Sequence, residues 1–434
     1  MTVVSRSAVS IDHVTPYDRF CRSDAAVEHL LASGEQRPAL EAYFGATEYR
    51  VLTRLARSAQ RAPRDQTLPQ VFIVPGILGS QLGLRRPSPL PDDVLWLDPL
   101  DIQSGRLALL DLDAAAPIVP LGVVLYSHLS LKLRLRAAGF SATLFAYDWR
   151  LGIETSAGAL AELLRLHAHA GVAIVAHSMG GLVSRAALAL PGTRHIERVV
   201  MLGTPNRGAF APLQALRGTY AVVRNVARLD LHRSAEELAM RVFNGFPSLY
   251  QMLPAGADGG LDLLDKAHWP RFGPLPRRDL LERARIFQAS LPAPDTRFST
   301  IAGVGEKTVT AVARRREGFV YTVTRAGDGT VPAASAALPE STSYYAPVAH
   351  SDLTRDARVA AAVIDLLRTG RTRRLPARWA SRSRAQARIS DGELGRLRSD
   401  KLDWARLTPG ERQAFLERLN EPPPLRLRIP SRRR

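Results

Sequence analysis

The sequence contains a single cysteine and no long apolar run, and each shortage excludes a class of protein. Cys21 is the only cysteine among 434 residues, so the chain can form no internal disulfide and offers no cysteine-based zinc site. No stretch reaches the roughly 18 uninterrupted apolar residues that a membrane-spanning helix needs. The start of the chain lacks the continuous apolar core of about 7–15 residues that marks a signal peptide. We therefore expect a cytoplasmic protein, with membrane association and export by an unrecognised signal left open.

Positive charge is concentrated near the end of the sequence. Residues 371–434 hold 18 of the 59 Lys and Arg and 7 of the 41 Asp and Glu, so +11 of the formal net charge of +18 lies there. Such a tail is attracted to anionic membrane lipid by roughly 1 kcal/mol per basic residue near the surface. A solvated extension without a partner is the alternative. Nucleic-acid binding is disfavoured, because this tail has only two tryptophans and one phenylalanine to stack on bases.

The spacing of apolar residues predicts an α/β protein in three parts. Residues 1–68 show helical spacing over Ala25–Leu31 and Arg37–Ala59, which predicts a helical lead-in. Residues 69–370 alternate short apolar runs with helical segments, as in a mostly parallel sheet covered by helices on both faces. The expected strands are Gln70–Val74, Ala142–Ala146, Ala173–Ala176, Arg198–Leu202, Ser299–Gly303 and Val320–Thr324. The expected helices are Ser127–Ala138, Ala157–Ala168, the segment that begins at Met179, and Asp352–Arg368.

Two segments depart from this alternation. Residues 205–297 mix proline, glycine, aromatic and charged residues and show no obvious strand. An insertion at this point would lie over the carboxyl ends of the strands, where α/β sheets place their sites, so we predict a cap. Residues 371–434 form a basic C-terminal extension with no strand signal, although Leu394–Leu419 has helical spacing.

The strongest chemical signal is the segment GVAIVAHSMGGLVS at residues 171–184. A β-like run leads into Ser178, and a helix-compatible segment leaves it. A serine at such a sharp strand-to-helix turn has a strained backbone and presents its oxygen at the end of the sheet. Small residues are needed two positions to either side, where Gly180 meets the pattern and Ala176 replaces the more usual glycine. We predict that Ser178 is a nucleophile; a helix-capping serine is the alternative.

A serine hydroxyl needs a base and a supporting carboxylate, which follow in the order acid, then histidine, in this arrangement. Asp328 lies in a Gly-Asp-Gly turn just past an expected strand, and His350 precedes the last expected helix. We predict that Asp328 is the acid and His350 the base. The alternative for Asp328 is an ordinary turn residue. Asp352 is a rival acid, although it is poorly separated from His350.

The other histidines fit the role of base less well. We expect His177, inside the turn, to point away from the reaction. His128 precedes the expected acid, and His268 lies in the expected cap. Packing or surface roles are expected for His167, His169, His195 and His232.

Negative charge on a carbonyl oxygen must be met by backbone N–H groups. Met179, directly after the serine, supplies one candidate donor. The glycine-rich turn after the first expected strand supplies the second, which we assign to Ile77, with a plain strand-ending turn as the alternative. No metal or diffusible cofactor is required by this chemistry.

Together these residues resemble the lecithin:cholesterol acyltransferase family, which includes lysosomal phospholipase A2-like enzymes. The matching segments, between residue 71 and about residue 367, are VFIVPGILGSQL, YDWR, AHSMGGLVSR, MLGTPNRG and GDGTVP, with His350 beyond them. The resemblance implies the α/β-hydrolase fold, with a triad on Ser178, Asp328 and His350 and an oxyanion loop at Ile77. Unlike secreted family members, this chain cannot form a disulfide-closed lid.

The resemblance also implies a substrate site at YDWR. Tyr147 and Trp149 would border the acyl pocket, and Asp148 would pair with Arg150; a plain structural role is the alternative. Family members take acyl groups from phospholipids and pass them to water or an alcohol.

Three functions are therefore open. The first is a serine-dependent lipid acyl hydrolase or O-acyltransferase that forms an acyl-enzyme on Ser178. The second is a carboxylesterase or thioesterase for small acyl esters. The third is a non-catalytic binding protein that uses its basic tail.

Overall fold

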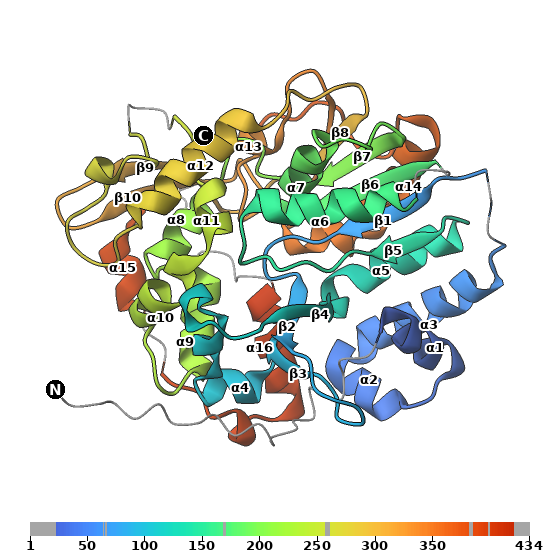
Figure 1. Cartoon of the computed structure of the whole chain (residues 1–434), viewed down its shortest axis with the longest axis horizontal. Coiled ribbons are helices and arrows are strands. Elements are labelled where there is room, and N and C mark those ends of the chain that lie inside the picture. Colours follow the sequence, from blue (N-terminus) through green and yellow to red (C-terminus); the bar gives the residue numbers. More distant parts are fainter. Residues whose placement is uncertain are drawn as a thin grey trace.

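The computed structural model describes residues 23–63, 65, 67–167, 171–256, 261–381, 385–397 and 400–420 (Figure 1). Cys21 and His169 lie outside the described residues, as does the stretch 421–434 of the basic tail.

The centre of the described chain is a six-stranded sheet in which every pair of neighbours is parallel. The strands lie in the order β11 (Thr342–Ala346), β8 (Phe298–Gly303), β7 (Ile196–Leu202), β6 (Val172–His177), β1 (Gln70–Val74) and β5 (Ala142–Leu144). Helices α5 (Leu125–Ala137), α6 (Ile153–Arg165), α7 (Met179–Leu188) and α14 (Ala357–Thr369) cover it.

The strands are apolar throughout because both faces of the sheet are buried. Successive side chains of a strand point to opposite faces. In β1, Phe72 and Val74 belong to the core that contains the buried side chains of α6 and α7. Val71 and Ile73 belong to a second core with those of α5 and α14. The prediction of a sheet covered on both faces is confirmed (Figure 1).

The sixth strand of the central sheet differs from the prediction. Val320–Thr324 is indeed part of a strand, β10 (Phe319–Thr324), but it lies in a separate antiparallel sheet with β9 (Thr308–Arg314). Its side chains are buried alternately, as expected for a sheet with one covered face. The sixth place in the central sheet, at its edge beside β8, is taken by β11, whose sequence TSYYA is too polar at its start to be recognised as a buried strand.

A third, antiparallel sheet and several short elements also lie within residues 69–370. This sheet has the order β3 (Asp93–Trp96), β2 (Ser80–Leu84) and β4 (Val119–Val123). Two short helices are α4 (Pro99–Gln103) and α13 (Ala333–Ala336). The 3-10 turns are Arg106–Leu110, Leu112–Ala114 and Ser351–Thr354.

The N-terminal helices pack on α5 through a core of their own. They are α1 (Asp24–Ser33), α2 (Arg37–Phe44) and α3 (Ala46–Arg61). The predicted helix Arg37–Ala59 is divided in two at Gly45, whose φ of 80° is a left-handed conformation that suits glycine.

Residues 205–256 and 261–297 contain helices and no strand among the described residues. The helices are α8 (Phe210–Leu216), α9 (Ala221–Leu229), α10 (Ala235–Arg241), α11 (Pro247–Gln251) and α12 (Arg278–Ser290). Two 3-10 turns, Phe243–Gly245 and Lys266–His268, connect them. We call α8–α12 and their connections the cap.

The described part of the C-terminal extension packs against the rest of the protein, which corrects the idea of a solvated tail without strands. Its elements are β12 (Ala387–Ser390), α15 (Asp391–Arg396), the 3-10 turn Trp404–Arg406 and α16 (Pro409–Asn420). β12 pairs with β10 as the third strand of that antiparallel sheet. In Figure 1 the C-terminal helices, in red, lie beside the cap. Strand pairing between residues 320–323 and 387–390 has no local sequence signal.

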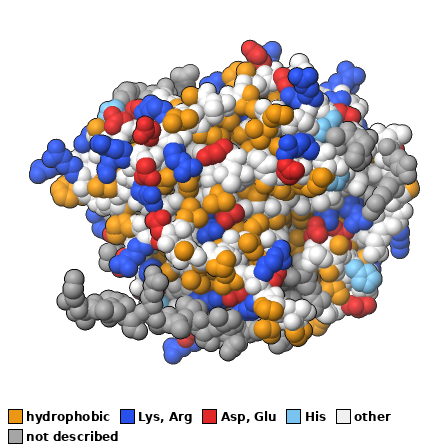
Figure 2. Space-filling model, in the orientation of Figure 1, with side chains coloured by type: hydrophobic (Ala, Val, Ile, Leu, Met, Phe, Trp, Pro, Cys, Tyr) orange, Lys and Arg blue, Asp and Glu red, His pale blue; other side chains and the backbone are white. Residues whose placement is uncertain are grey.

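The surface gives no support for one continuous basic patch on the face drawn in Figure 2. There, Lys and Arg side chains are interspersed with Asp and Glu. Within the part of the chain that is described, no helix is both long enough and apolar enough to cross a bilayer.

Candidate active site

Ser178 occupies the sharp turn between β6 and α7. Its φ of 54° and ψ of −127° are strained for a residue other than glycine. The backbone N–H of Ser178 donates to the carbonyl of Leu202 in the neighbouring strand β7, at 2.8 Å. The strain is therefore held in place by the sheet.

Close packing explains the small residues around this turn. A Cβ atom on Gly180 would lie 2.4 Å from the carbonyl oxygen of Val74, and one on Gly76 would lie 2.7 Å from Cβ of Ser178. Ala176 is fully buried in the main core, which accepts its methyl group. Because backbone atoms form most of these contacts, larger side chains could be accepted only by displacing the strand or the helix.

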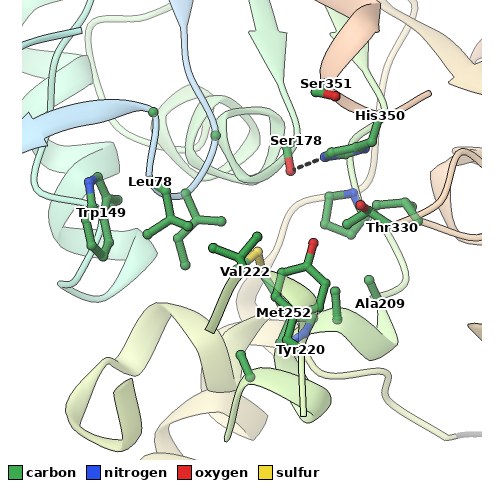
Figure 3. Close-up of a pocket in the computed structure, with 18 of the residues that line it drawn as sticks. Leu78, Trp149, Ser178, Ala209, Tyr220, Val222, Met252, Thr330, His350 and Ser351 are labelled. Atoms are coloured by element: carbon green, nitrogen blue, oxygen red, sulfur yellow. Dashed lines mark hydrogen bonds between the residues drawn. The ribbon is translucent and has the colours of Figure 1, made fainter. Parts of the chain in front are cut away.

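The structure brings the three predicted side chains together. His350 Nε2 lies 2.9 Å from Ser178 Oγ (Figure 3). His350 Nδ1 lies 2.8 Å from Asp328 Oδ2. A carboxylate only accepts hydrogen bonds, so Nδ1 of His350 must donate to Asp328. In a neutral ring this leaves Nε2 free to accept the Ser178 hydroxyl proton. The arrangement is suited to transfer of that proton to the imidazole.

A serine at a strand-to-helix turn of a parallel sheet, followed along the chain by its acid and then its histidine, distinguishes one fold. The chain has an α/β-hydrolase fold.

The chain is similar to one protein family over part of its length and to several solved structures. A family model described as a PGAP1-like alpha/beta domain matches residues 159–246. No curated protein sequence matches the chain. Solved structures similar to this α/β-hydrolase include the Bacillus licheniformis lipase BlEst2 in mature form, with 15% identity, a TM-score of 0.37, and 70% of this chain and 94% of that chain covered. A chain of the Tle4-Tli4 complex has 16% identity, a TM-score of 0.40, and 72% and 99% covered. Phospholipase PlaB from Legionella pneumophila has 12% identity, a TM-score of 0.35, and 70% and 60% covered.

The turn after β10 orients the carboxylate of Asp328. Its Oδ1 accepts the backbone N–H groups of Thr330 and Val331, at 3.0 and 2.7 Å. The N–H of His350 donates to the carbonyl of Asp328 at 2.9 Å, which joins the two loops directly. Each carboxylate oxygen therefore has its own partner, and Oδ2 is directed at the imidazole.

Two glycines leave room for this pair, and the sequence did not single them out. A Cβ atom on Gly203 would lie 3.0 Å from His350 Nδ1 and 3.1 Å from Asp328 Oδ2. One on Gly303 would lie 2.5 Å from Cβ of Asp328. Gly203 belongs to the MLGTPNRG segment, so the position of a glycine just past a strand was the available signal.

We expect Gly203→Ala to lower kcat on an ester substrate by about 10²-fold, because the methyl group would displace the His350–Asp328 pair. Gly203 also has a φ of 59°, so Gly256→Ala, at a φ of 62° with nothing within 4 Å, is the matched control. Steady-state kinetics of both variants are the measurement. Equal kcat values for the two variants would contradict the assigned crowding.

The YDWR segment supports the loop opposite Ser178. Tyr147 donates its hydroxyl to the carbonyl of Pro75 at 2.7 Å, and the indole of Trp149 donates to the carbonyl of Ser80 at 2.9 Å. The predicted place of Tyr147 in the substrate pocket is therefore wrong: its buried phenol supports the loop and does not line the cavity. Trp149 does line the cavity.

The other two residues of the YDWR segment pair with each other, and the predicted oxyanion donors lie near Ser178. Asp148 and Arg150 form the expected ion pair, with two contacts of 3.0 and 2.6 Å. Ile77 lies in the cavity wall. Met179 is the first residue of α7, where a backbone N–H has no acceptor within its helix. Leu78, which follows Ile77 in the loop after β1, has a φ of 63°. This loop is therefore strained where it faces Ser178.

A largely apolar cavity lies between Ser178 and the cap. It contains about 1090 Å³ of empty space, part of it open to solvent. Figure 3 shows Ser178 and His350 on one side and the cap residues Tyr220, Val222 and Met252 facing them. Apolar residues from the loop, the cap and the C-terminus line it: Ile77, Leu78, Trp149, Val222, Val223, Phe243, Leu249, Met252 and Leu419.

The cap also directs one hydroxyl group toward the hydrogen-bonded side chains of Ser178, His350 and Asp328. Tyr220, at the start of α9, points its phenol oxygen toward Thr330 and His350 in Figure 3. Burial raises the pKa of Tyr220 to about 12. This phenol therefore stays neutral and is the main polar group that the cap adds to an apolar wall. No sequence motif marked it.

Two further histidines, His177 and His128, line the same cavity as His350, and neither was assigned to the site from sequence. His177 Nε2 lies 3.0 Å from the carbonyl of His350, so this nitrogen must carry a proton and donate. The rings of His177 and His350 are 4.8 Å apart, and His128 follows at 5.8 Å from His177. Burial, with the neighbouring His350 and His128, holds the pKa of His177 well below its usual value. His177 therefore positions the His350 loop as a neutral group.

Burial of His128 makes stability depend on pH. Burial lowers the pKa of His128 from 6.5 to about 4, so between these values the unfolded chain binds more protons than the folded one. The free energy of unfolding should fall as the pH drops from 7 to 4, by about 3 kcal/mol from this residue at 1.36 kcal/mol per pKa unit. Urea unfolding at several pH values measures this loss.

His128→Leu should reduce the pH dependence of stability, whereas His29→Leu, at an exposed position of α1, should leave it unchanged. An equally steep loss of stability in His128→Leu would show that other groups dominate.

Proposed function

We propose that the protein is a serine-dependent lipid acyl hydrolase or O-acyltransferase that acts on ester bonds through an acyl-enzyme on Ser178. The observation that carries the proposal is the hydrogen-bonded series Ser178–His350–Asp328 opening directly onto an apolar cavity. A serine hydroxyl and a histidine base by themselves could attack any ester and do not select a substrate. An apolar wall supplied by the loop and the cap favours an acyl chain over a polar acid.

The first half of the reaction forms the acyl-enzyme. Ser178 Oγ attacks the ester carbonyl carbon while its proton passes to His350 Nε2, and Asp328 stabilises the imidazolium. The N–H groups of Met179 and Ile77 hold the oxyanion. When the intermediate collapses, the bond to the alcohol breaks, and that alcohol leaves with the proton from His350.

The second half releases the acyl group. Water or a second alcohol gives its proton to His350 and attacks the acyl carbon, and Ser178 regains its proton as the acyl–serine bond breaks. The resemblance of VFIVPGILGSQL joined to YDWR to the lecithin:cholesterol acyltransferase family supports phospholipid as the acyl donor. Whether water or an alcohol accepts the acyl group depends on how far the cap excludes water.

The test combines an active-site label with product analysis. The purified chain is incubated with a fluorophosphonate probe, and the labelled peptide is identified. Phospholipid vesicles and a series of nitrophenyl esters are then supplied with and without a long-chain alcohol. We expect labelling at Ser178, release of fatty acid from the vesicles, and a new ester if an alcohol is the acceptor.

Other outcomes separate the remaining functions. Labelling at Ser178 with turnover of short-chain esters only would support a carboxylesterase. Absence of both labelling and turnover would refute the proposal and leave a binding protein with a hydrolase scaffold.

A further inference from the structure

We propose that the C-terminal helix α16 limits the length of the acyl chain that the active site accepts, and that Leu419 is the limiting residue. The proposal rests on the function proposed above and adds a specificity determinant to it. Leu419 lies 241 positions after Ser178, in a segment outside the family resemblance, yet both line the same cavity.

Leu419 is an integral part of the cavity wall. Its side chain is 2% exposed and belongs to the main hydrophobic core. It lines the cavity together with Val222 and Val223 of α9, the cap helix against which α16 packs. A buried branched side chain in a close-packed wall restricts the space beside it.

The segment before α16 is fastened to the cap by buried polar contacts. Asp391 pairs with Arg217, at the end of α8, at 3.0 Å, and accepts the Tyr321 hydroxyl at 2.6 Å and the Phe319 N–H at 3.0 Å. Breaking such a buried pair on one side leaves an uncompensated charge. This contact therefore holds the start of α15 in one position.

A lysine makes the next attachment. Lys401 Nζ donates to the carbonyls of Ala227, Asp230 and Arg233, at 2.8, 2.5 and 2.5 Å. These carbonyls lie at and just beyond the end of α9, where a helix leaves acceptors unsatisfied and favours a positive charge. The chain is thus held against the helix that carries Val222 and Val223.

The helix α16 is held from both sides. Its Phe415 packs edge-on against Trp404, with ring centroids 6.1 Å apart. Gln413 donates to the carbonyl of Phe44 in α2 at 3.3 Å, and Asn225 of α9 donates to the carbonyl of Arg418 at 3.4 Å. Because α16 lies between the cap and the N-terminal helices, Leu419 cannot easily move aside for a longer chain.

The size of residue 419 should therefore set the preferred acyl length. Leu419→Ala removes three carbon atoms from the wall and should move the optimum of kcat/KM toward longer nitrophenyl esters. Leu419→Trp adds volume and should move it toward shorter ones. Each methylene group that gains or loses a buried position should change kcat/KM by about fourfold.

The experiment uses the full chain and nitrophenyl esters from acetyl to palmitoyl. Leu416→Ala is the matched control, because Leu416 lies on the same helix and packs on the same core without lining the cavity. It should keep the wild-type optimum. Leu419→Val and Leu419→Phe replace the two larger changes if thermal unfolding shows that those destabilise the chain.

The outcomes separate this proposal from the proposed function. Labelling by a short fluorophosphonate should proceed at the wild-type rate in every variant, which shows that Ser178 is intact. Normal labelling with an unchanged optimum, or with an equal fall of kcat/KM for all esters, would overturn the role of Leu419 and leave the proposed function standing. Absence of labelling in the wild-type chain would instead refute the proposed function.

Discussion

Ser178→Ala is expected to lower kcat on an ester substrate by on the order of 10⁶-fold and to abolish fluorophosphonate labelling. The size of the effect follows from loss of the covalent step: without Oγ no acyl-enzyme forms, and only the oxyanion donors and binding remain. The substitution should be tolerated structurally, because alanine keeps the Cβ atom that Gly76 accommodates. The measurements are steady-state kinetics and labelling followed by mass spectrometry.

Ser351→Ala provides a matched control for this prediction. Ser351 follows His350 directly and lines the same cavity, so it is a second serine within the site. Its hydroxyl oxygen is buried and makes no hydrogen bond within the part of the chain that is described, so removing it breaks no polar contact and should leave kcat within about twofold. Turnover that survives Ser178→Ala but disappears in Ser351→Ala would show that the nucleophile has been assigned to the wrong residue.

Asp328→Asn is expected to lower kcat by about 10⁴-fold while leaving the fold intact. Oδ1 of Asp328 accepts two backbone N–H groups, so the carbonyl oxygen of an asparagine would remain there and its amide nitrogen would face His350. An NH₂ group donates, which would force Nδ1 of His350 to accept and Nε2 to carry the proton. In that tautomer Nε2 cannot accept the proton of Ser178.

Asp352→Asn distinguishes this tautomer effect from a general loss of negative charge near His350. Asp352 is the nearer carboxylate in sequence, but its side chain is 39% exposed and its contact with Arg355 is 3.8 Å long. We expect kcat within about twofold of the wild type for Asp352→Asn. The rate of fluorophosphonate labelling should follow kcat in both variants. A larger loss in Asp352→Asn than in Asp328→Asn would contradict the assignment of the acid.

The local parts of the site were predictable because short-range rules determine them. The run before Ser178 had to be a buried strand, and the small residues around the turn reflect contacts with β1 that allow no larger side chain. The turn at Asp328 was recognisable from its two flanking glycines. These positions, with His350, are the ones that the structure places within hydrogen-bond distance.

Other parts depended on neighbours that no local pattern reveals. Tyr147 was expected at the pocket, but its hydroxyl has an acceptor 72 residues earlier, in the Pro75 carbonyl, and so it lies behind the loop. His128 was judged a poor candidate for the base because it precedes the acid along the chain, yet its position in α5 places it in the wall of the cavity. The prediction placed β10 in the central sheet, where the structure has β11, for the same reason. Both segments can form strands, and only packing decides which sheet each one joins.

The sequence alone determined the elements with strong periodicity and the order of the serine, the carboxylate and the imidazole, because each of these signals is contained within a few neighbouring residues. The tertiary structure decided what surrounds them. It placed residues 385–397 and 400–420 against the cap through the Asp391 and Lys401 contacts, and it brought Leu419 into a cavity whose serine lies in the middle of the chain. Contacts between residues so far apart in sequence depend on which buried surfaces pack well against each other. The spacing of residues along the chain does not reveal which surfaces those are.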